Sequence, residues 1–74
     1  MSGSRPIFVG SRLAELRAER GWTQAQLARA LDPAATDTLR ASVSRWESGR
    51  YQPSGSWVAR ICAVLDVPPA VLFL

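Results

Sequence analysis

The chain has 74 residues, enough for one small domain, and 47% of them are hydrophobic while 20% are charged. That balance is too apolar for a disordered chain, and no apolar run approaches the ~20 residues that span a bilayer. The net charge is +3, and one cysteine with no histidine excludes both an internal disulfide and a zinc site. The nine basic residues, all arginine, concentrate in residues 1–20 and 38–52.

Apolar residues at helical spacing predict a first helix over about residues 10–20, with Gly21 as its C-terminal stop. Thr23 then has the character of an N-cap, and Gln26 three residues later completes a capping box that predicts the start of a second helix. Pro33 prevents a simple continuation of that helix. Its buried side is expected to hold Leu27, Ala28 and Leu31.

A third helix is predicted to follow a loop of small and turn-forming residues over 32–37. Asp37 or Thr38 is the expected N-cap, Ser48 the last helical residue and Gly49 the residue that ends the helix. The stripe expected to face the core consists of Leu39, Val43 and Trp46.

The opposite side of this third helix should face solvent, because each residue advances 100° around the axis. That side is small, polar and cationic. It consists of Ala41, Ser44, Arg45 and Ser48, with Arg40 and Glu47 on one flank.

A fourth helix is predicted to start after a cap at Ser54 or Ser56 and to end at Asp66. The pair Pro68 and Pro69 then begins a short last turn, since proline is accepted where a helix starts. The apolar end over 71–74 suits closure of the core first, a two-fold dimer interface second, or contact with another protein. No strand pattern occurs, so the fold class is all-α with four helices and a short fifth.

The order and register of these elements resemble the Cro and phage-repressor type of helix-turn-helix, a large family of prokaryotic transcription regulators. The segments that carry the resemblance are residues 13–17, 20–24, 27–28, 43–50 and 65–73. The resemblance implies a compact lambda-repressor-like DNA-binding domain over residues 9–74, with the helix-turn-helix at helices two and three. A flexible N-terminal arm over residues 1–8 would precede it.

The resemblance also implies roles for individual residues. Those matching the base-reading positions of the third helix are Arg40, Ala41, Ser44 and Arg45. Those matching phosphate contacts are Thr23 and Gln24 at the second helix, and Arg50, Tyr51 and Gln52 in the loop after the third. Arg17 and Glu47 match a pair that ties helix one to helix three by a salt bridge, which would fix the angle of the reading helix.

One departure from the family pattern lies between helices two and three, where the chain is roughly five residues longer over 32–37. Either the turn bulges out or the third helix gains an N-terminal turn, as Leu39 on the apolar stripe suggests. Both alternatives change how deeply the reading helix would enter the DNA groove. The acidic Asp32 and Asp37 in this segment would also repel phosphate.

These features predict sequence-specific binding of double-stranded DNA by a transcriptional regulator, most simply a repressor. Two copies would read half-sites about one helical turn apart, so we expect a pseudo-palindromic operator and a homodimer at least on DNA. The alternative is a protein-interaction module on the same fold, as in an antitoxin or a bridging factor. No histidine or activated nucleophile is present, so we expect no catalytic residues, metal or cofactor. Without a signal peptide or a membrane span, we expect a cytoplasmic protein.

Overall fold

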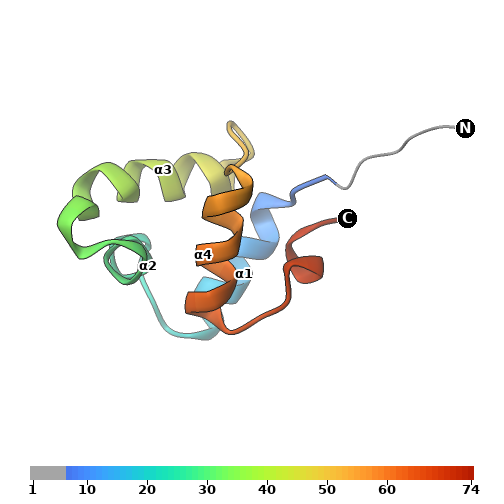
Figure 1. The fold of residues 1–74 in the computed structure, drawn as a ribbon, viewed down its shortest axis with the longest axis horizontal. Coiled ribbons are helices and arrows are strands. Elements are labelled where there is room, and N and C mark those ends of the chain that lie inside the picture. The colour runs from blue at the N-terminus through green and yellow to red at the C-terminus, as the bar shows by residue number, and fades with distance from the viewer. Residues whose placement is uncertain (1–6) are drawn as a thin grey trace, which may run out of the picture.

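A computed structural model describes residues 7–74, and most of the expected N-terminal arm lies outside these residues. The described chain is all-α, as predicted (Figure 1). Helix α3 runs along one side of the molecule, α4 crosses the middle, and the described chain begins and ends at the same side. The elements are α1 (Gly10–Glu19), α2 (Gln24–Leu31), the 3₁₀ helix η1 (Pro33–Ala35), α3 (Thr36–Ser48), α4 (Gly55–Leu65) and the 3₁₀ helix η2 (Pro69–Leu72).

The predicted helix ends after α1 and α3 are confirmed. Gly21 and Gly49 have φ angles of 71° and 81°, the left-handed region that favours glycine. After α1 the backbone N–H of Trp22 donates to the carbonyl of Arg17 at 3.2 Å, which closes the helix in a Schellman-type turn. These two glycines therefore set where the chain leaves each helix.

The capping box at the start of α2 is also confirmed. Thr23 Oγ1 accepts a hydrogen bond from the backbone N–H of Gln26 at 3.1 Å, and Gln26 Oε1 accepts one from the N–H of Thr23 at 2.7 Å. Two otherwise unpaired donors are thus satisfied reciprocally. The entry into α2 is fixed locally by the residues that the sequence pattern indicated.

The connection between α2 and α3 differs from the predicted loop over 32–37. Asp32 Oδ1 accepts a hydrogen bond from the N–H of Ala34 at 3.0 Å and so starts η1, with Pro33 at its first position. Helical backbone then resumes at Thr36, without a side-chain cap. The expectation that Asp37 or Thr38 caps α3 was wrong, because η1 leads the chain directly into the helix and places Asp37 inside its first turn.

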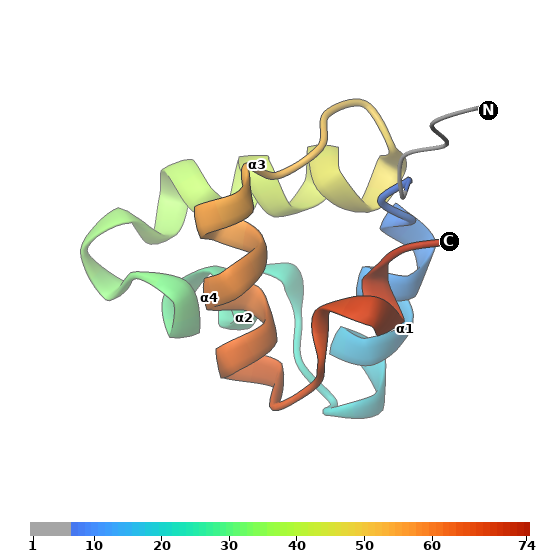
Figure 2. The same cartoon turned by 45° about the vertical axis from the view of Figure 1, so that its right-hand side comes forward.

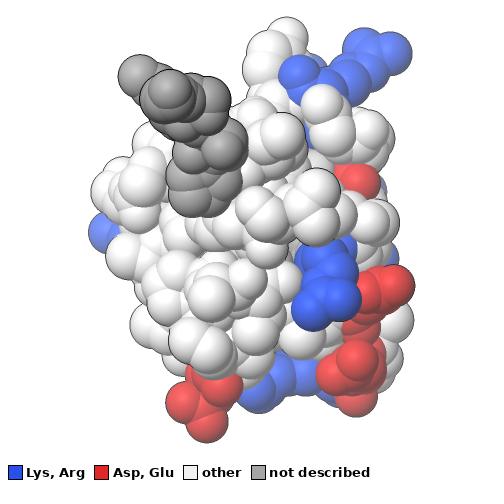
Figure 3. Space-filling view, turned by 90° about the vertical axis from the view of Figure 1, so that its right-hand side faces the viewer, with Lys and Arg blue, Asp and Glu red and all other residues white. Residues whose placement is uncertain are grey.

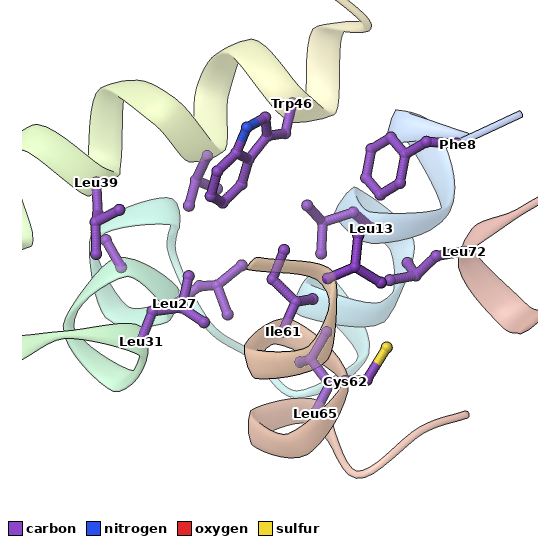
Figure 4. Close-up of a cluster of buried hydrophobic side chains, with 13 residues drawn as sticks. Phe8, Leu13, Leu27, Leu31, Leu39, Trp46, Ile61, Cys62, Leu65 and Leu72 are labelled. Atoms are coloured by element: carbon purple, nitrogen blue, oxygen red, sulfur yellow. The ribbon is translucent and has the colours of Figure 1, made fainter. Parts of the chain in front are cut away.

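The core is one apolar cluster between α1, α2, α3 and α4 (Figure 4). Leu27 from α2, Val43 from α3 and Ile61 from α4 are fully buried in it. The predicted stripe of α3 is confirmed, since Leu39 and Trp46 are buried together with Val43. This stripe fixes the rotation of α3 about its axis, because the apolar side chains leave water only in that orientation.

The two ends of the described chain close the core together (Figure 2). The backbone N–H of Val9 donates to the carbonyl of Leu72 at 2.8 Å, and the rings of Phe8 and Phe73 pack edge to face at 5.8 Å. Leu72 is fully buried, in agreement with the first-ranked role of the apolar end, whereas Leu74 is 89% exposed. Phe8 was assigned to the arm, but its ring is buried and belongs to the folded domain.

Candidate nucleic-acid interface

The outward face of α3 carries the four residues that were matched to base reading. Arg40, Ala41, Ser44 and Arg45 are all exposed, on the opposite side of the helix from the buried stripe. Because α3 begins at Thr36, this face also includes Asp37, one turn before Ala41. Asp37 was expected before the third helix or at its cap, so it was not expected on this face.

The N-terminus of α2 lies against the middle of α3. Gln24, Arg40, Ala41 and Ser44 together line a shallow hollow of about 250 Å³. The side-chain amide of Gln24 donates a hydrogen bond to Glu47 Oε1 at 2.9 Å. The structure therefore brings one residue matched to phosphate binding beside three matched to base reading.

The first turn of α2 can also offer backbone donors. The capping box uses the N–H groups of Thr23 and Gln26, and within residues 7–74 those of Gln24 and Ala25 have no backbone acceptor. Unpaired N–H groups and the positive end of the helix dipole both favour an anion at this position. Thr23 is exposed, but its hydroxyl is already the acceptor in the capping box.

The loop after α3 folds back on the C-terminal end of that helix. The backbone N–H of Arg50 donates to the carbonyl of Arg45 at 3.0 Å. The guanidinium carbon of Arg45 lies 5.9 Å from the centre of the Tyr51 ring, which is a cation–π contact. Arg50, Tyr51 and Gln52 are all exposed, and the contact with Tyr51 places the start of this loop beside Arg45.

Glu47 links α3 to both of the preceding helices. Its carboxylate accepts hydrogen bonds from Arg17 Nε at 2.6 Å and Arg17 Nη2 at 3.0 Å, in addition to the bond from Gln24. Arg17 Nη1 also donates to the carbonyl of Trp22 at 2.7 Å. The pair that the resemblance implied is thus a salt bridge with two hydrogen bonds. Arg17 also binds the backbone of Trp22, in the segment between α1 and α2.

The surroundings of this salt bridge favour the charged state of Arg17. Its side chain is 18% exposed and that of Glu47 is 7% exposed. The hydrogen bonds to Glu47 raise the pKa of Arg17 above its ordinary value, and the negative charge of Glu47 adds to this, while desolvation opposes both. Arg17 therefore keeps its positive charge at any pH near neutrality.

Comparison with known families identifies the architecture. The family model described as "Helix-turn-helix domain" matches residues 9–72. The chain belongs to this family. Comparisons with curated proteins and with solved structures gave no significant match. The helix-turn-helix assignment agrees with the resemblance drawn from the sequence, and it points to DNA binding.

The described residues also bear on metal binding, membrane crossing and thiol chemistry. Within residues 7–74 no three or more acidic, cysteine or histidine side chains gather as a metal site would require. None of the helices in the same residues is long and apolar enough to cross a membrane. Cys62 is buried in α4, and burial raises the pKa of its thiol, so the thiolate is disfavoured.

Proposed function

We propose that this helix-turn-helix domain binds a specific sequence in duplex DNA and regulates transcription, most simply as a repressor that occupies an operator. The observation that carries the proposal is the small, cationic outward face of α3, flanked by the N-terminus of α2 and by the loop after α3. An α-helix with this kind of face fits the major groove, where base pairs differ in their donors and acceptors. Such a role requires access to the chromosome and hence a cytoplasmic location.

The proposed base contacts and phosphate contacts come from different parts of this surface. In the major groove, Arg45 and Arg40 have the reach and the paired donors to bind a guanine, and the small Ala41 and Ser44 let the helix approach the bases. Phosphate contacts would fix the register of the domain without reading sequence. We assign these to Thr23 and Gln24 on one side and to Arg50, Tyr51 and Gln52 on the other.

One domain of this size makes few contacts, so we propose that two copies bind a pseudo-palindromic site. Half-sites would then lie about 34 Å apart, one helical turn of DNA. The face at which the described residues begin and end is largely uncharged at its centre, with charged side chains toward its edges (Figure 3). This face, which includes the 57% exposed Ile7 and the 89% exposed Leu74, suits a contact between copies.

The same uncharged face supports the second candidate, a protein-interaction module. The two functions differ in their response to salt. A DNA-binding domain loses affinity steeply as salt rises, because phosphate contacts release counterions. Titration with mixed-sequence duplex at low and moderate salt therefore separates them, and absence of any salt-dependent binding favours the protein contact.

Selection from random duplexes is the direct test of the proposed function. It is expected to return one enriched, two-fold symmetric motif, which gives the operator and the stoichiometry together. Failure to enrich any motif at low salt would refute sequence-specific binding.

Two substitutions then test the assigned roles. Arg45→Ala should weaken binding to the selected site by about 1–3 kcal/mol and relax the preference at one base pair. Arg50→Ala should weaken binding to all sequences alike and lower the salt slope by about one. Arg12→Ala is the matched control, because it removes an exposed arginine that is assigned to neither group of DNA contacts. The side chain of Arg12 extends from α1 to the Val71 carbonyl. Equal behaviour of the Arg45 and Arg50 variants would show that the sorting into readers and positioners is wrong.

A further inference from the structure

The extra N-terminal turn of α3 adds a carboxylate to the proposed DNA-facing side. Asp37 is exposed, and within residues 7–74 its side chain forms neither a hydrogen bond nor a salt bridge. The carboxylate of Glu47, by contrast, already accepts hydrogen bonds from Arg17 and Gln24. Within the described residues, Asp37 is thus an acid whose carboxylate has no side-chain or backbone partner.

The helix geometry places Asp37 in line with the assigned readers. At 100° per residue, Asp37 and Ser44 point in directions only about 20° apart, and Ala41 lies about 40° from Asp37. At 1.5 Å per residue, Asp37 lies about 6 Å beyond Ala41 along the axis, a distance of roughly two base-pair steps. A helix that reads bases through Ala41 and Ser44 therefore presents Asp37 to neighbouring bases of the same groove.

The chemistry of a carboxylate restricts what it can meet there. An ionised carboxylate only accepts hydrogen bonds. In the major groove guanine offers acceptors only, and adenine sets its N6 donor beside the N7 acceptor, which repels a carboxylate. The exocyclic N4 amine of cytosine is the donor that Asp and Glu characteristically contact. Without such a donor, the charge would lie unpaired close to the phosphates.

We infer that Asp37 is a specificity residue that accepts a hydrogen bond from the N4 amine of a cytosine in each half-site. The inference rests on the proposed function and deepens it, because it names a base that the extended helix selects. Asp37 also lies in the first turn of α3, where a negative charge interacts favourably with the helix dipole and stabilises the helix. That effect changes stability and leaves base preference untouched, so the two roles are separable.

The test is selection from random duplexes with the wild-type domain and with Asp37→Ala and Asp37→Asn, followed by affinity measurement on the selected sites. The wild type is expected to require a C·G pair at one position of each half-site. Asp37→Ala should lose that requirement alone, with about tenfold weaker discrimination at this position. Asp37→Asn should shift the preference toward adenine, the base that Asn contacts.

Glu19→Gln at the end of α1 is the matched control, since it removes one exposed negative charge outside the proposed face. It should leave every position of the motif unchanged. Thermal unfolding of each variant measures the helix-dipole effect separately.

Three results would overturn the inference. Retention of the C·G requirement in both Asp37 variants would assign the base to another residue. A uniform gain in the affinity of the Asp37 variants for all sequences would show that Asp37 only repels phosphate. Either of these two results would leave the proposed function standing. Failure of the wild type to select any motif would remove the proposed function and the inference with it.

Discussion

Gly10 of α1 lies close against the backbone of α3, and a substitution there tests this packing. It is the first residue of α1 and is buried. A methyl group added at its α-carbon would meet the backbone carbonyl oxygen of Glu47 at 2.8 Å and that of Trp46 closer still. Both oxygens belong to the last turn of α3. The substitution Gly10→Ala therefore probes the contact that holds the end of the reading helix against α1.

The expected magnitude comes from two opposing effects. In an open helical position, replacing glycine by alanine stabilises a protein by up to about 0.5–1 kcal/mol. At Gly10 the added carbon overpacks a filled site, which typically costs about 1–3 kcal/mol. The obstacles are main-chain oxygens, which cannot rotate away as a flexible side chain can. We therefore expect a net loss of about 2 kcal/mol, or roughly 8–16 °C in Tm for a domain of this size.

The measurement is urea and thermal unfolding of Gly10→Ala beside Gly55→Ala. Gly55 is the first residue of α4, and a methyl group there meets nothing within 4 Å. The same chemical change should therefore leave stability unchanged or raise it slightly. Equal stability of the two variants would refute the close approach of α1 and α3.

Three further changes test other parts of the structure. Glu47→Gln should destabilise the domain by about 1.5–3 kcal/mol, because Arg17 loses its counter-charge; a double-mutant cycle with Arg17→Gln that gave additive losses would contradict this. Leu27→Ala empties a fully buried site and should cost about 2–5 kcal/mol in urea unfolding, against less than about 0.5 kcal/mol for the exposed Leu74→Ala. Burial raises the pKa of Cys62 above its ordinary value of 9.0, so its contribution to stability is fully present below about pH 9 and is lost as the pH rises through the higher folded-state value. Cys62→Ala should accordingly flatten the decline in unfolding free energy above about pH 9, and an unchanged decline would show that another group causes it.

The features that the residue pattern alone predicted most directly depend on near neighbours, whereas the salt bridge between Arg17 and Glu47 was expected from the family resemblance. The capping box of Thr23 and Gln26 involves residues three apart, and the buried stripe of α3 repeats every three or four residues. Gly21 and Gly49 end their helices because each adopts a left-handed conformation that other residues avoid. Local chemistry decides all of these, so one chain is enough to predict them.

Two features were predicted wrongly. One depends on competition between loop and 3₁₀ backbone, and the other depends on contacts between residues far apart in the sequence. The segment around Pro33 reads as a loop, yet a 3₁₀ turn capped by Asp32 keeps it helical. Helix α3 then begins at Thr36, in agreement with the alternative that the third helix gains an N-terminal turn. Phe8 stands before the first helical pattern, and only the return of the chain to Phe73 at the far end buries it. The assigned DNA contacts come from the family resemblance, and the structure supplies their exposure and proximity.

The contacts along α3 are unevenly distributed, and this has a consequence for recognition. Its C-terminal half is held by the paired hydrogen bonds of the Glu47 salt bridge and by close packing of Gly10 against its backbone. Over residues 36–42, Leu39 is the only buried side chain, and apolar packing restricts tilt less than paired hydrogen bonds do. In the proposed complex, base preference should therefore be strictest where Arg45 reads and more permissive where Asp37 does. Glu47→Gln should broaden the preference at the Arg45 position, since it frees the end of the helix that is otherwise fixed.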